Sequence, residues 1–283
     1  MNQIKIKCPA KINLTLEIVN KREDGFHNIK SIMQMISLYD YLTISVKEST
    51  ENKIMLSGNS AEIPYDEKNL VYKAAKLFLE KAEINNAGIN IFIEKNIPIA
   101  AGLAGGSTDA AGTLFGLNIL FEKFTDEELH KLAATLGSDL NVCLAGGCNL
   151  ATSRGEVIKK LPSRESEVTL IKPINLGISA GEAYKKYSLK EIKPQNNMTE
   201  NMLIAVLDDE NISKFLYNDL EYAVFDDYAE LQKIKETYPQ AIMSGSGSTY
   251  FMLQNLDSCK LPEEKFLFIN NLKFIPNGVG LLS

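Results

Sequence analysis

The chain has 283 residues, of which 45% are hydrophobic and 23% charged, and its formal net charge is −6. This length accommodates two ordinary domains. Because no basic arm or stripe is present, the acidic balance argues against a protein that binds nucleic acid. No apolar run approaches the roughly 18 residues of a membrane helix, and the first residues lack a signal peptide's apolar core. We therefore expect a cytoplasmic protein with neither nucleic acid nor membrane as a partner.

The cysteines and histidines are few and have no metal-binding pattern. The four cysteines show no C-x-x-C spacing, and only two histidines, His27 and His130, could assist them. Reduced thiols in a cytoplasmic protein are the simplest account of this composition. The sequence therefore predicts no metal site built from protein ligands, and we expect His130 to lie on the surface of its helix.

Strand and helix patterns are interleaved through the first half. Apolar residues alternate at 3–8, 12–19, 41–47 and 89–93, as in half-buried strands. Asp66 is expected to cap a helix that extends to about Lys81. Together with the elements that follow, this pattern predicts the α+β class.

A second helix has clear signals at both ends. Thr125 and Glu128 have the spacing of a capping box, and Gly137 is expected to end the helix. Beyond it, the polar run that follows Glu156 is the expected boundary between two domains, residues 1–156 and 157–283.

The second half opens with an apolar strand and then offers helices near 199–208, 211–225 and 226–237. Two short strand patterns flank a second glycine-rich turn, Ser244–Ser248. Two glycine-rich loops on different domains suggest a ligand cleft between them.

The first glycine-rich loop lies in the segment Pro98–Leu117, after a strand pattern and before an apolar helix for which Thr108 or Asp109 is the expected cap. Such a loop directs unpaired N–H groups and the positive end of a helix dipole toward one point, which favours phosphate. A tight turn that lets a helix pack closely on a sheet would use the same small residues. The loop alone does not decide between these alternatives.

Spacing excludes two familiar phosphate loops. A Walker A loop needs a lysine before its Ser or Thr, whereas Gly106 is followed directly by Ser107. The dinucleotide fingerprint needs glycine two residues after the first, and Ala104 stands there after Gly102.

Several polar residues could carry chemistry, and each has a plainer alternative. Lys11 and Asn13 share one face of a strand and suit a phosphate or a hydroxyl, although a strand-edge lysine is usually solvated. Asp139 could accept or orient the proton of an attacking hydroxyl, or it could simply cap a turn. Phe26 and His27 follow a turn, where they could stack on and read a nucleobase or cover the core edge.

Three further positions stay ambiguous. Lys95 could neutralise a phosphate or contact a nucleotide, or it could be an exposed strand end, and Asn69 is equally open. Arg154 is most simply a residue of a hairpin turn.

Taken in order, five segments resemble the GHMP kinase superfamily, and they extend over most of the chain. They are PAKINLTLEI (Pro9–Ile18), DGFHNIKSIMQ (Asp24–Gln34), the loop Pro98–Ala111, GSDLNVCLAGG (Gly137–Gly147) and MSGSGSTYFML (Met243–Leu253). Gly105-Gly106, where many relatives have serines, and the Asp-Gly-aromatic-His turn are typical of the branch whose substrate carries cytidine.

The resemblance implies a two-domain fold, with an N-terminal domain like domain 2 of ribosomal protein S5, a ferredoxin-like C-terminal domain and the active site between them. It implies transfer of the ATP γ-phosphate to the 2-hydroxyl of 4-diphosphocytidyl-2-C-methyl-D-erythritol (CDP-methylerythritol). Lys11 and Asp139 would be catalytic, and Mg²⁺ is expected with ATP, held mostly by phosphates and water.

The remaining site residues follow from the same resemblance. The ATP-binding residues would be Asn69, Lys95, Pro98, Ala101, Gly102, Leu103, Ala104, Gly105, Gly106, Ser107 and Thr108. The acceptor-binding residues would be Asn13, Phe26, His27 and Tyr184, with Phe26 and Tyr184 stacking on opposite faces of cytosine.

Three positions depart from the family pattern. Asn141 stands where proline is usual, Ala180 stands where threonine is common, and Phe26 replaces a tyrosine. Another GHMP alcohol kinase and a non-catalytic nucleotide sensor of the same fold remain as alternatives. A sensor need not keep both Lys11 and Asp139.

Overall fold

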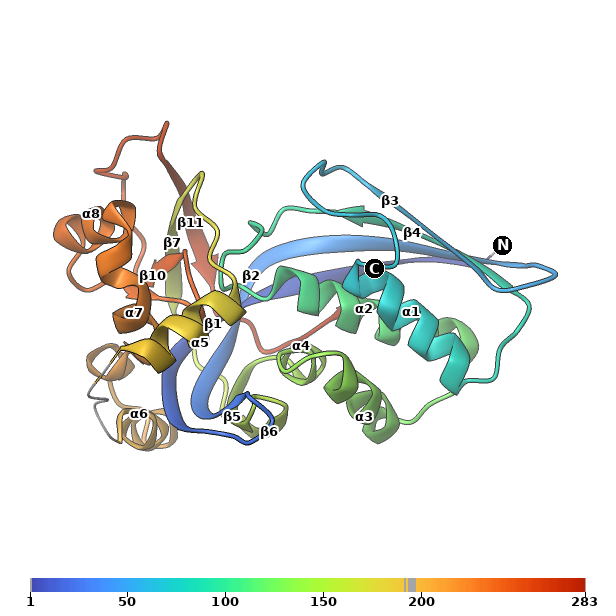
Figure 1. Ribbon diagram of the computed structural model, residues 1–283, viewed down its shortest axis with the longest axis horizontal. Coiled ribbons are helices and arrows are strands. Elements are labelled where there is room, and N and C mark those ends of the chain that lie inside the picture. Colours follow the sequence, from blue (N-terminus) through green and yellow to red (C-terminus); the bar gives the residue numbers. More distant parts are fainter. Residues whose placement is uncertain (1, 191, 193–196, 283) are drawn as a thin grey trace.

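The computed structural model describes residues 2–190, 192 and 197–282. It contains two sheets with helices packed against them, so the predicted α+β class is confirmed (Figure 1). The larger sheet has the order β12-β1-β2-β4-β3, with β5 pairing with β2 and β6, and β8 pairing with β1. The smaller sheet has the order β11-β7-β10-β9.

The larger sheet comprises β1 (Asn2–Lys21), β2 (His27–Glu48), β3 (Lys53–Gly58), β4 (Ala87–Glu94), β5 (Cys148–Ser153), β6 (Val157–Leu161), β8 (Tyr217–Asn218) and β12 (Gly280–Leu281). The smaller comprises β7 (Glu167–Pro173), β9 (Ile242–Met243), β10 (Tyr250–Met252) and β11 (Phe266–Lys273). The helices are α1 (Leu70–Lys81), α2 (Gly105–Phe121), α3 (Asp126–Leu136), α4 (Leu140–Ala145), α5 (Ala180–Leu189), α6 (Met198–Leu207), α7 (Asp219–Val224) and α8 (Ala229–Thr237). Short 3₁₀ turns occupy Ile212–Phe215 and Phe225–Asp227.

Strand β1 is the element that joins the two halves of the molecule. The two strands expected at 3–8 and 12–19 form one long strand, which pairs with β2 from Asn2 opposite Val46 to Lys21 opposite His27. The expected break near Pro9 is instead a shift of register, since a bulge lets the pairing continue past a residue that lacks an N–H. In Figure 1 both strands bend and extend into the left half of the molecule.

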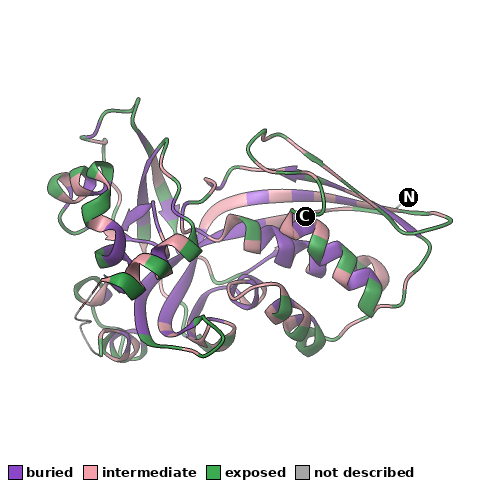
Figure 2. Ribbon diagram, viewed as in Figure 1, coloured by how far each residue is buried: buried purple, intermediate pink, exposed green. Residues whose placement is uncertain are grey.

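Helices α1 and α2 cover one face of the larger sheet, and their inward faces are buried (Figure 2). Helix α2 lies close to the sheet because of two glycines. A Cβ added at Gly112 would lie 2.4 Å from Cys8 Sγ, and one at Gly116 would lie 2.6 Å from Ile44 Cδ1. Close packing of a helix on a sheet, left open as one reason for the glycines, therefore accounts for these two.

The positions at which α1 and α2 begin correct two predictions. Helix α1 begins at Leu70 with Asn69 as its N-cap, because the Asn69 side chain, not that of Asp66, accepts from the N–H of Val71. Helix α2 begins at Gly105 after Ala104 in a left-handed conformation, so Thr108 and Asp109 lie inside the helix and do not cap it. The capping box that starts α3 is confirmed.

The prediction of one helix over 211–225 is wrong, because other elements interrupt the helical pattern there. A 3₁₀ turn is followed by β8, which pairs with β1, and only then by the short helix α7. Asn218 holds this break, since its Nδ2 donates to the carbonyl oxygens of Met243 and Gly245 and its Oδ1 accepts from Leu220 N–H. The helix predicted at 226–237 begins three residues later, at Ala229.

Strand pairing also bears on the division of the chain. The boundary expected after Glu156 falls within the β5–β6 hairpin, and β12 returns to pair with β1. The larger sheet therefore includes residues from both proposed domains. Over the ranges that the structure describes, no helix is both long and apolar enough to cross a bilayer.

Candidate active site

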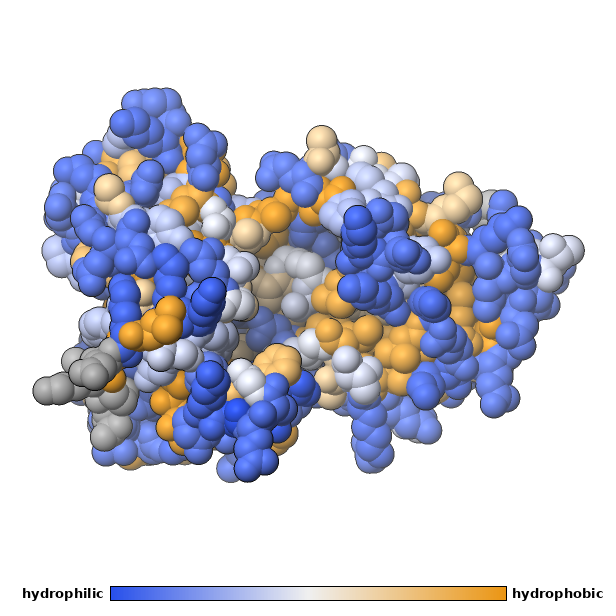
Figure 3. Space-filling model, viewed as in Figure 1, coloured by the Kyte–Doolittle hydropathy of each residue, from blue (hydrophilic) through white to orange (hydrophobic). Residues whose placement is uncertain are grey.

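A cavity of about 950 Å³ lies between the two halves of the molecule, and Figure 3 shows the surface hollowed there. It is lined by residues from β1, the β1–β2 turn, the glycine loop, the start of α2 and helix α5. Every site residue expected from the sequence lines it except Thr108, whose side chain is fully buried.

Lys11 lines this cavity from strand β1. Its side chain is only 4% exposed, so the alternative of a solvated strand-edge lysine is excluded. The Nζ atom lies 2.7 Å from Asn13 Oδ1, 3.1 Å from the carbonyl oxygen of Gly102 and 3.4 Å from Asp139 Oδ2. One ammonium therefore connects strand β1, the glycine loop and the aspartate.

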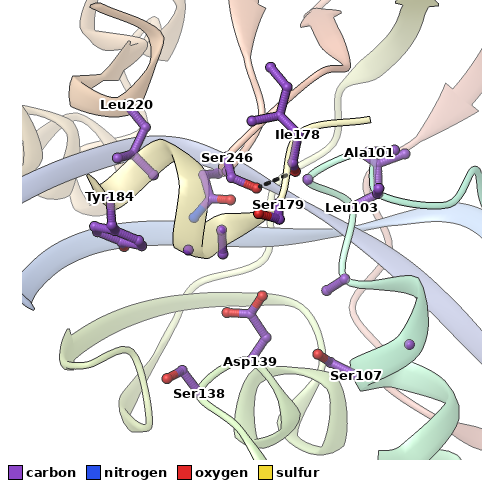
Figure 4. A pocket seen from close by; sticks show the side chains of 18 of the residues that line it. Ala101, Leu103, Ser107, Ser138, Asp139, Ile178, Ser179, Tyr184, Leu220 and Ser246 are labelled. Carbon is purple, nitrogen blue, oxygen red and sulfur yellow. Dashed lines mark hydrogen bonds between the residues drawn. The ribbon is translucent and has the colours of Figure 1, made fainter. Parts of the chain in front are cut away.

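Asp139 occupies the N-cap position of α4, as the plainer alternative anticipated, but its side chain makes no capping hydrogen bond. The carboxylate is 28% exposed and points into the cavity from below, facing the second half of the chain (Figure 4). A carboxylate beside a buried ammonium can accept or orient the proton of a hydroxyl that enters the cavity.

Asn141, the departure from the usual proline, anchors the start of α4. Its Nδ2 donates to the carbonyl oxygen of Glu156 at 2.8 Å, and its Oδ1 lies 3.0 Å from His130 Nδ1. His130, expected on the surface of its helix, is half-buried because its ring also contacts Asn141 at the start of α4. The backbone after Asp139 stays helical.

The glycine loop presents backbone to the cavity. Ala104 has no side-chain oxygen to cap α2, so the N–H groups of the first helical turn keep their donor capacity. Gly102 has φ +73°, and a Cβ there would lie 1.9 Å from the carbonyl oxygen of Ser244. Ser244 Oγ also donates to the carbonyl oxygen of Gly102, so the second glycine turn supports the first. A Cβ at Gly106 would meet open space.

Asn69 and Lys95 both line the cavity, and Lys95 lies close to Gly105. The side chain of Asn69 caps α1 and donates to the carbonyl oxygen of Pro64. Lys95 is only 6% exposed and pairs with Asp40 and Asp109, so the alternative of an exposed strand end is wrong.

The opposite end of the cavity is aromatic. Phe26 is 53% exposed, and the guanidinium of Arg154 lies 5.2 Å from the centre of its ring. His27 is buried, its Nε2 lies 3.1 Å from Ser188 Oγ, and its ring stacks on that of Tyr184 at 5.1 Å. In this structure Tyr184 thus contacts His27. Burial, aided by Lys21, lowers the pKa of His27, so the imidazole is neutral at neutral pH.

Apart from Tyr184, sequence reasoning missed the lining residues from the second half of the chain. Ser179, Ser188 and Ser246 line the cavity, and Ser246 Oγ donates to the carbonyl oxygen of Ile178 (Figure 4). Ser246 lies in the second glycine-rich turn, and that turn was the sequence signal that could have identified it as a lining residue. Asp40, which supports Lys95, gave no motif at all.

A two-part α+β fold, a glycine loop at a helix start and a lysine–aspartate pair between them are the features of a GHMP-type kinase. The family model of the GHMP kinases N terminal domain matches residues 69–152. The chain is 39% identical to the 4-diphosphocytidyl-2-C-methyl-D-erythritol kinase of Clostridioides difficile (strain 630) over 94% of this chain and 92% of that protein. It is 41% identical to the kinase of that name from Prochlorococcus marinus (strain MIT 9301), over 89% of this chain and 86% of that one.

Two solved structures of kinases have the same fold as this chain. A crystal structure of 4-(cytidine 5′-diphospho)-2C-methyl-D-erythritol kinase aligns with a TM-score of 0.74 at 29% identity, covering 96% of this chain and 99% of that one. Homoserine kinase from Cytophaga hutchinsonii aligns at 0.76 over 100% of this chain and 98% of that one, but at 16% identity it shows the fold alone. The chain belongs to the family of 4-diphosphocytidyl-2-C-methyl-D-erythritol kinases, and it is an ATP-dependent kinase.

Proposed function

We propose that this kinase transfers the γ-phosphoryl group of ATP to the 2-hydroxyl of CDP-methylerythritol, the substrate named in its relatives, in isoprenoid precursor biosynthesis. The observation that carries the proposal is the Lys11–Asp139 pair, which lies between a glycine loop at one end of the cavity and an aromatic cluster at the other. A nucleoside-linked alcohol and ATP are both long molecules, and this cavity has a distinct environment for each.

Asp139 would orient the acceptor hydroxyl and accept its proton. Lys11 would keep that carboxylate in place and offset the charge on the phosphoryl group as it moves. Because phosphoryl transfer has a loose transition state, positioning and charge stabilisation should contribute more than proton removal. Asn13 supports this role, since its Oδ1 accepts from Lys11 and its Nδ2 donates to Ser31 Oγ. A sensor without turnover would have no need for this arrangement.

The ATP phosphates would bind along Ala101–Ser107, chiefly through backbone N–H groups at the start of α2. Thr108 would support the loop from within, because its side chain is buried. Asn69 and Lys95 would lie toward the same nucleotide.

Mg²⁺ would accompany ATP. Among the residues that the structure describes, no three His, Cys, Asp or Glu side chains form a group that could hold a metal ion. Phosphate oxygens and water would therefore supply most of its ligands, and the ion would offset phosphate charge.

The cytosine would bind at the aromatic end. Phe26 is exposed and available to stack on one face of the base, and the neutral imidazole of His27 can hydrogen-bond to its polar edge. Tyr184 now stacks on His27, so to cover the second face of cytosine its ring would have to leave that contact.

An acceptor panel tests the proposal. Purified protein with Mg-ATP is given CDP-methylerythritol, mevalonate or homoserine in turn, and ADP release is followed. We expect turnover with the cytidyl compound alone. Turnover with mevalonate or homoserine but not with CDP-methylerythritol would overturn the proposed substrate, and no turnover with any acceptor would favour a sensor.

A further inference from the structure

Three buried ionisable side chains meet near the start of α2, at the end of the cavity where we propose that ATP binds. Asp40 comes from β2, Lys95 follows β4, and Asp109 lies in the second turn of α2. Their side chains are 0%, 6% and 4% exposed. Lys95 Nζ contacts Asp40 Oδ2 and lies 2.9 Å from Asp109 Oδ2. The cluster therefore ties together three elements where the glycine loop begins.

Asp40 does more than neutralise the lysine. Its second oxygen, Oδ1, accepts from the backbone N–H groups of Asn96 at 2.6 Å and Ile97 at 2.8 Å. These residues lead directly into the glycine loop at Pro98. One carboxylate thus fixes both the side chain of Lys95 and the backbone that follows it, through hydrogen bonds strengthened by its charge.

The ammonium of Lys95 lies against the first turn of α2. A Cβ added at Gly105 would be 3.1 Å from Lys95 Nζ, so glycine permits this close approach. Burial alone would lower the pKa of Lys95, but Asp109 and Asp40 outweigh it and the pKa lies above its usual value. A permanent positive charge beside uncapped N–H groups adds to the attraction of a helix start for phosphate.

We propose that Asp40 is a positioning residue for ATP: by holding Lys95 and the backbone of residues 96–97, it keeps the ammonium beneath the first turn of α2. This inference rests on the proposed function only in placing ATP at that turn. Asp40 is fully buried and is not among the residues that line the cavity, so it acts through Lys95 and not on ATP directly.

The test measures affinity for Mg-ATP by isothermal titration calorimetry without any acceptor. Asp40→Asn keeps an acceptor for the two N–H groups and removes the charge that holds Lys95. We expect it to weaken ATP binding about tenfold, since a hydrogen bond to a charged group is worth a factor of roughly ten or more. Lys95→Gln should weaken binding at least as much. If Asp40 acts through Lys95, adding Asp40→Asn to Lys95→Gln should cause no further loss.

Asp219→Asn is the matched control for simple destabilisation. Asp219 is also fully buried, and its carboxylate accepts from Ile18 N–H at 2.7 Å and from the Tyr217 hydroxyl at 2.6 Å. This control should lower the melting temperature and leave ATP affinity within twofold of wild type.

Three results would overturn the proposal: ATP affinity of Asp40→Asn within twofold of wild type, additive losses in the double variant, or an equal loss of ATP affinity in Asp219→Asn. If Asp40→Asn does not fold, Lys95→Gln alone decides, since an ATP affinity within twofold of wild type in that variant contradicts the proposal. If the wild-type protein binds ATP but does not phosphorylate CDP-methylerythritol, the proposed acceptor is wrong, and the role of Asp40 is unaffected.

Discussion

The two ends of the cavity are built in different ways. At the glycine-loop end, where we propose that ATP binds, the lining includes the small residues Gly102, Gly105 and Gly106, and the buried side chain of Lys95 supports it. At the other end the surface is made of side chains, among them Phe26, which is 53% exposed. A backbone site depends on a few small residues that nothing else can replace. A side-chain site can change its ligand through single substitutions with little effect on the fold.

We expect the largest effect from Asp139, which lies between the two ends of the cavity. Asp139→Asn should lower kcat by roughly 10²–10⁴, the usual contribution of a positioned acid–base group, if chemistry limits the rate. Both KM values should change little, because the contact with the reacting hydroxyl is a small part of the lining that binds the two substrates. Steady-state kinetics with each substrate varied would check this. A kcat within a few-fold of wild type would remove Asp139 from the mechanism.

At the aromatic end, Phe26→Ala should raise KM for the cytidyl substrate, because the variant loses about 1–3 kcal/mol of stacking on the base. KM for ATP and the melting temperature should stay near wild type, because the ring is largely exposed. Phe26→Tyr, which restores the residue common in relatives, is the matched control and should bind like wild type. If Phe26→Ala weakens ATP binding instead, the two ends have been assigned the wrong way round.

At the backbone end, Gly102→Ala should destabilise the fold by about 1–3 kcal/mol, because the added Cβ would overlap the carbonyl oxygen of Ser244 at φ +73°. Gly106→Ala adds the same atom in open space, at the start of a helix, and should leave stability unchanged or slightly higher. Thermal unfolding of both variants checks the contrast. Equal melting temperatures would show that the loop tolerates side chains at Gly102.

The buried cluster of Asp40, Lys95 and Asp109 also predicts how stability depends on pH. Burial raises the pKa of Asp109 to about 7 against the opposing effect of Lys95, and Asp40 reinforces the rise. Between pH 4 and 7 the folded protein therefore holds a proton that the unfolded chain releases. The stability due to this proton is complete below the usual pKa of 3.8 and is lost as pH rises through 7.

Asp109→Asn imitates the protonated carboxyl at every pH. The stability of the variant relative to wild type should increase by about 1–3 kcal/mol between pH 5 and pH 8. Denaturant unfolding of both proteins at the two pH values measures this. A difference that does not change with pH would mean that Asp109 is already ionised at pH 5.

The sequence predicted the elements with strong local signals and missed those set by distant contacts. The capping box of α3 and the glycine loop carry their signals within a few residues, so both could be recognised. The interruption by β8 depends on hydrogen bonds from Asn218 to Met243 and Gly245, which no local pattern records. Periodicity there predicted one helix, and tertiary contacts overrode it.

The same distinction applies to the site. The Lys11–Asp139 pair was recognised because both residues lie in family motifs, although Asp139 alone could have been a cap. Asp40 could not be found, because an isolated aspartate just before a strand pattern gives no sign that it is buried against Lys95. The stacking of Tyr184 on His27 joins two halves of the chain and likewise has no local signal.

The most direct test of the central claim identifies the product. Wild-type protein is incubated with Mg-ATP and CDP-methylerythritol, and the mixture is examined by ³¹P NMR and mass spectrometry. We predict one new phosphomonoester on the 2-hydroxyl of the acceptor, formed in equal amount with ADP, while its diphosphate remains intact. ADP without a phosphorylated acceptor, or a phosphate at another hydroxyl, would contradict this account.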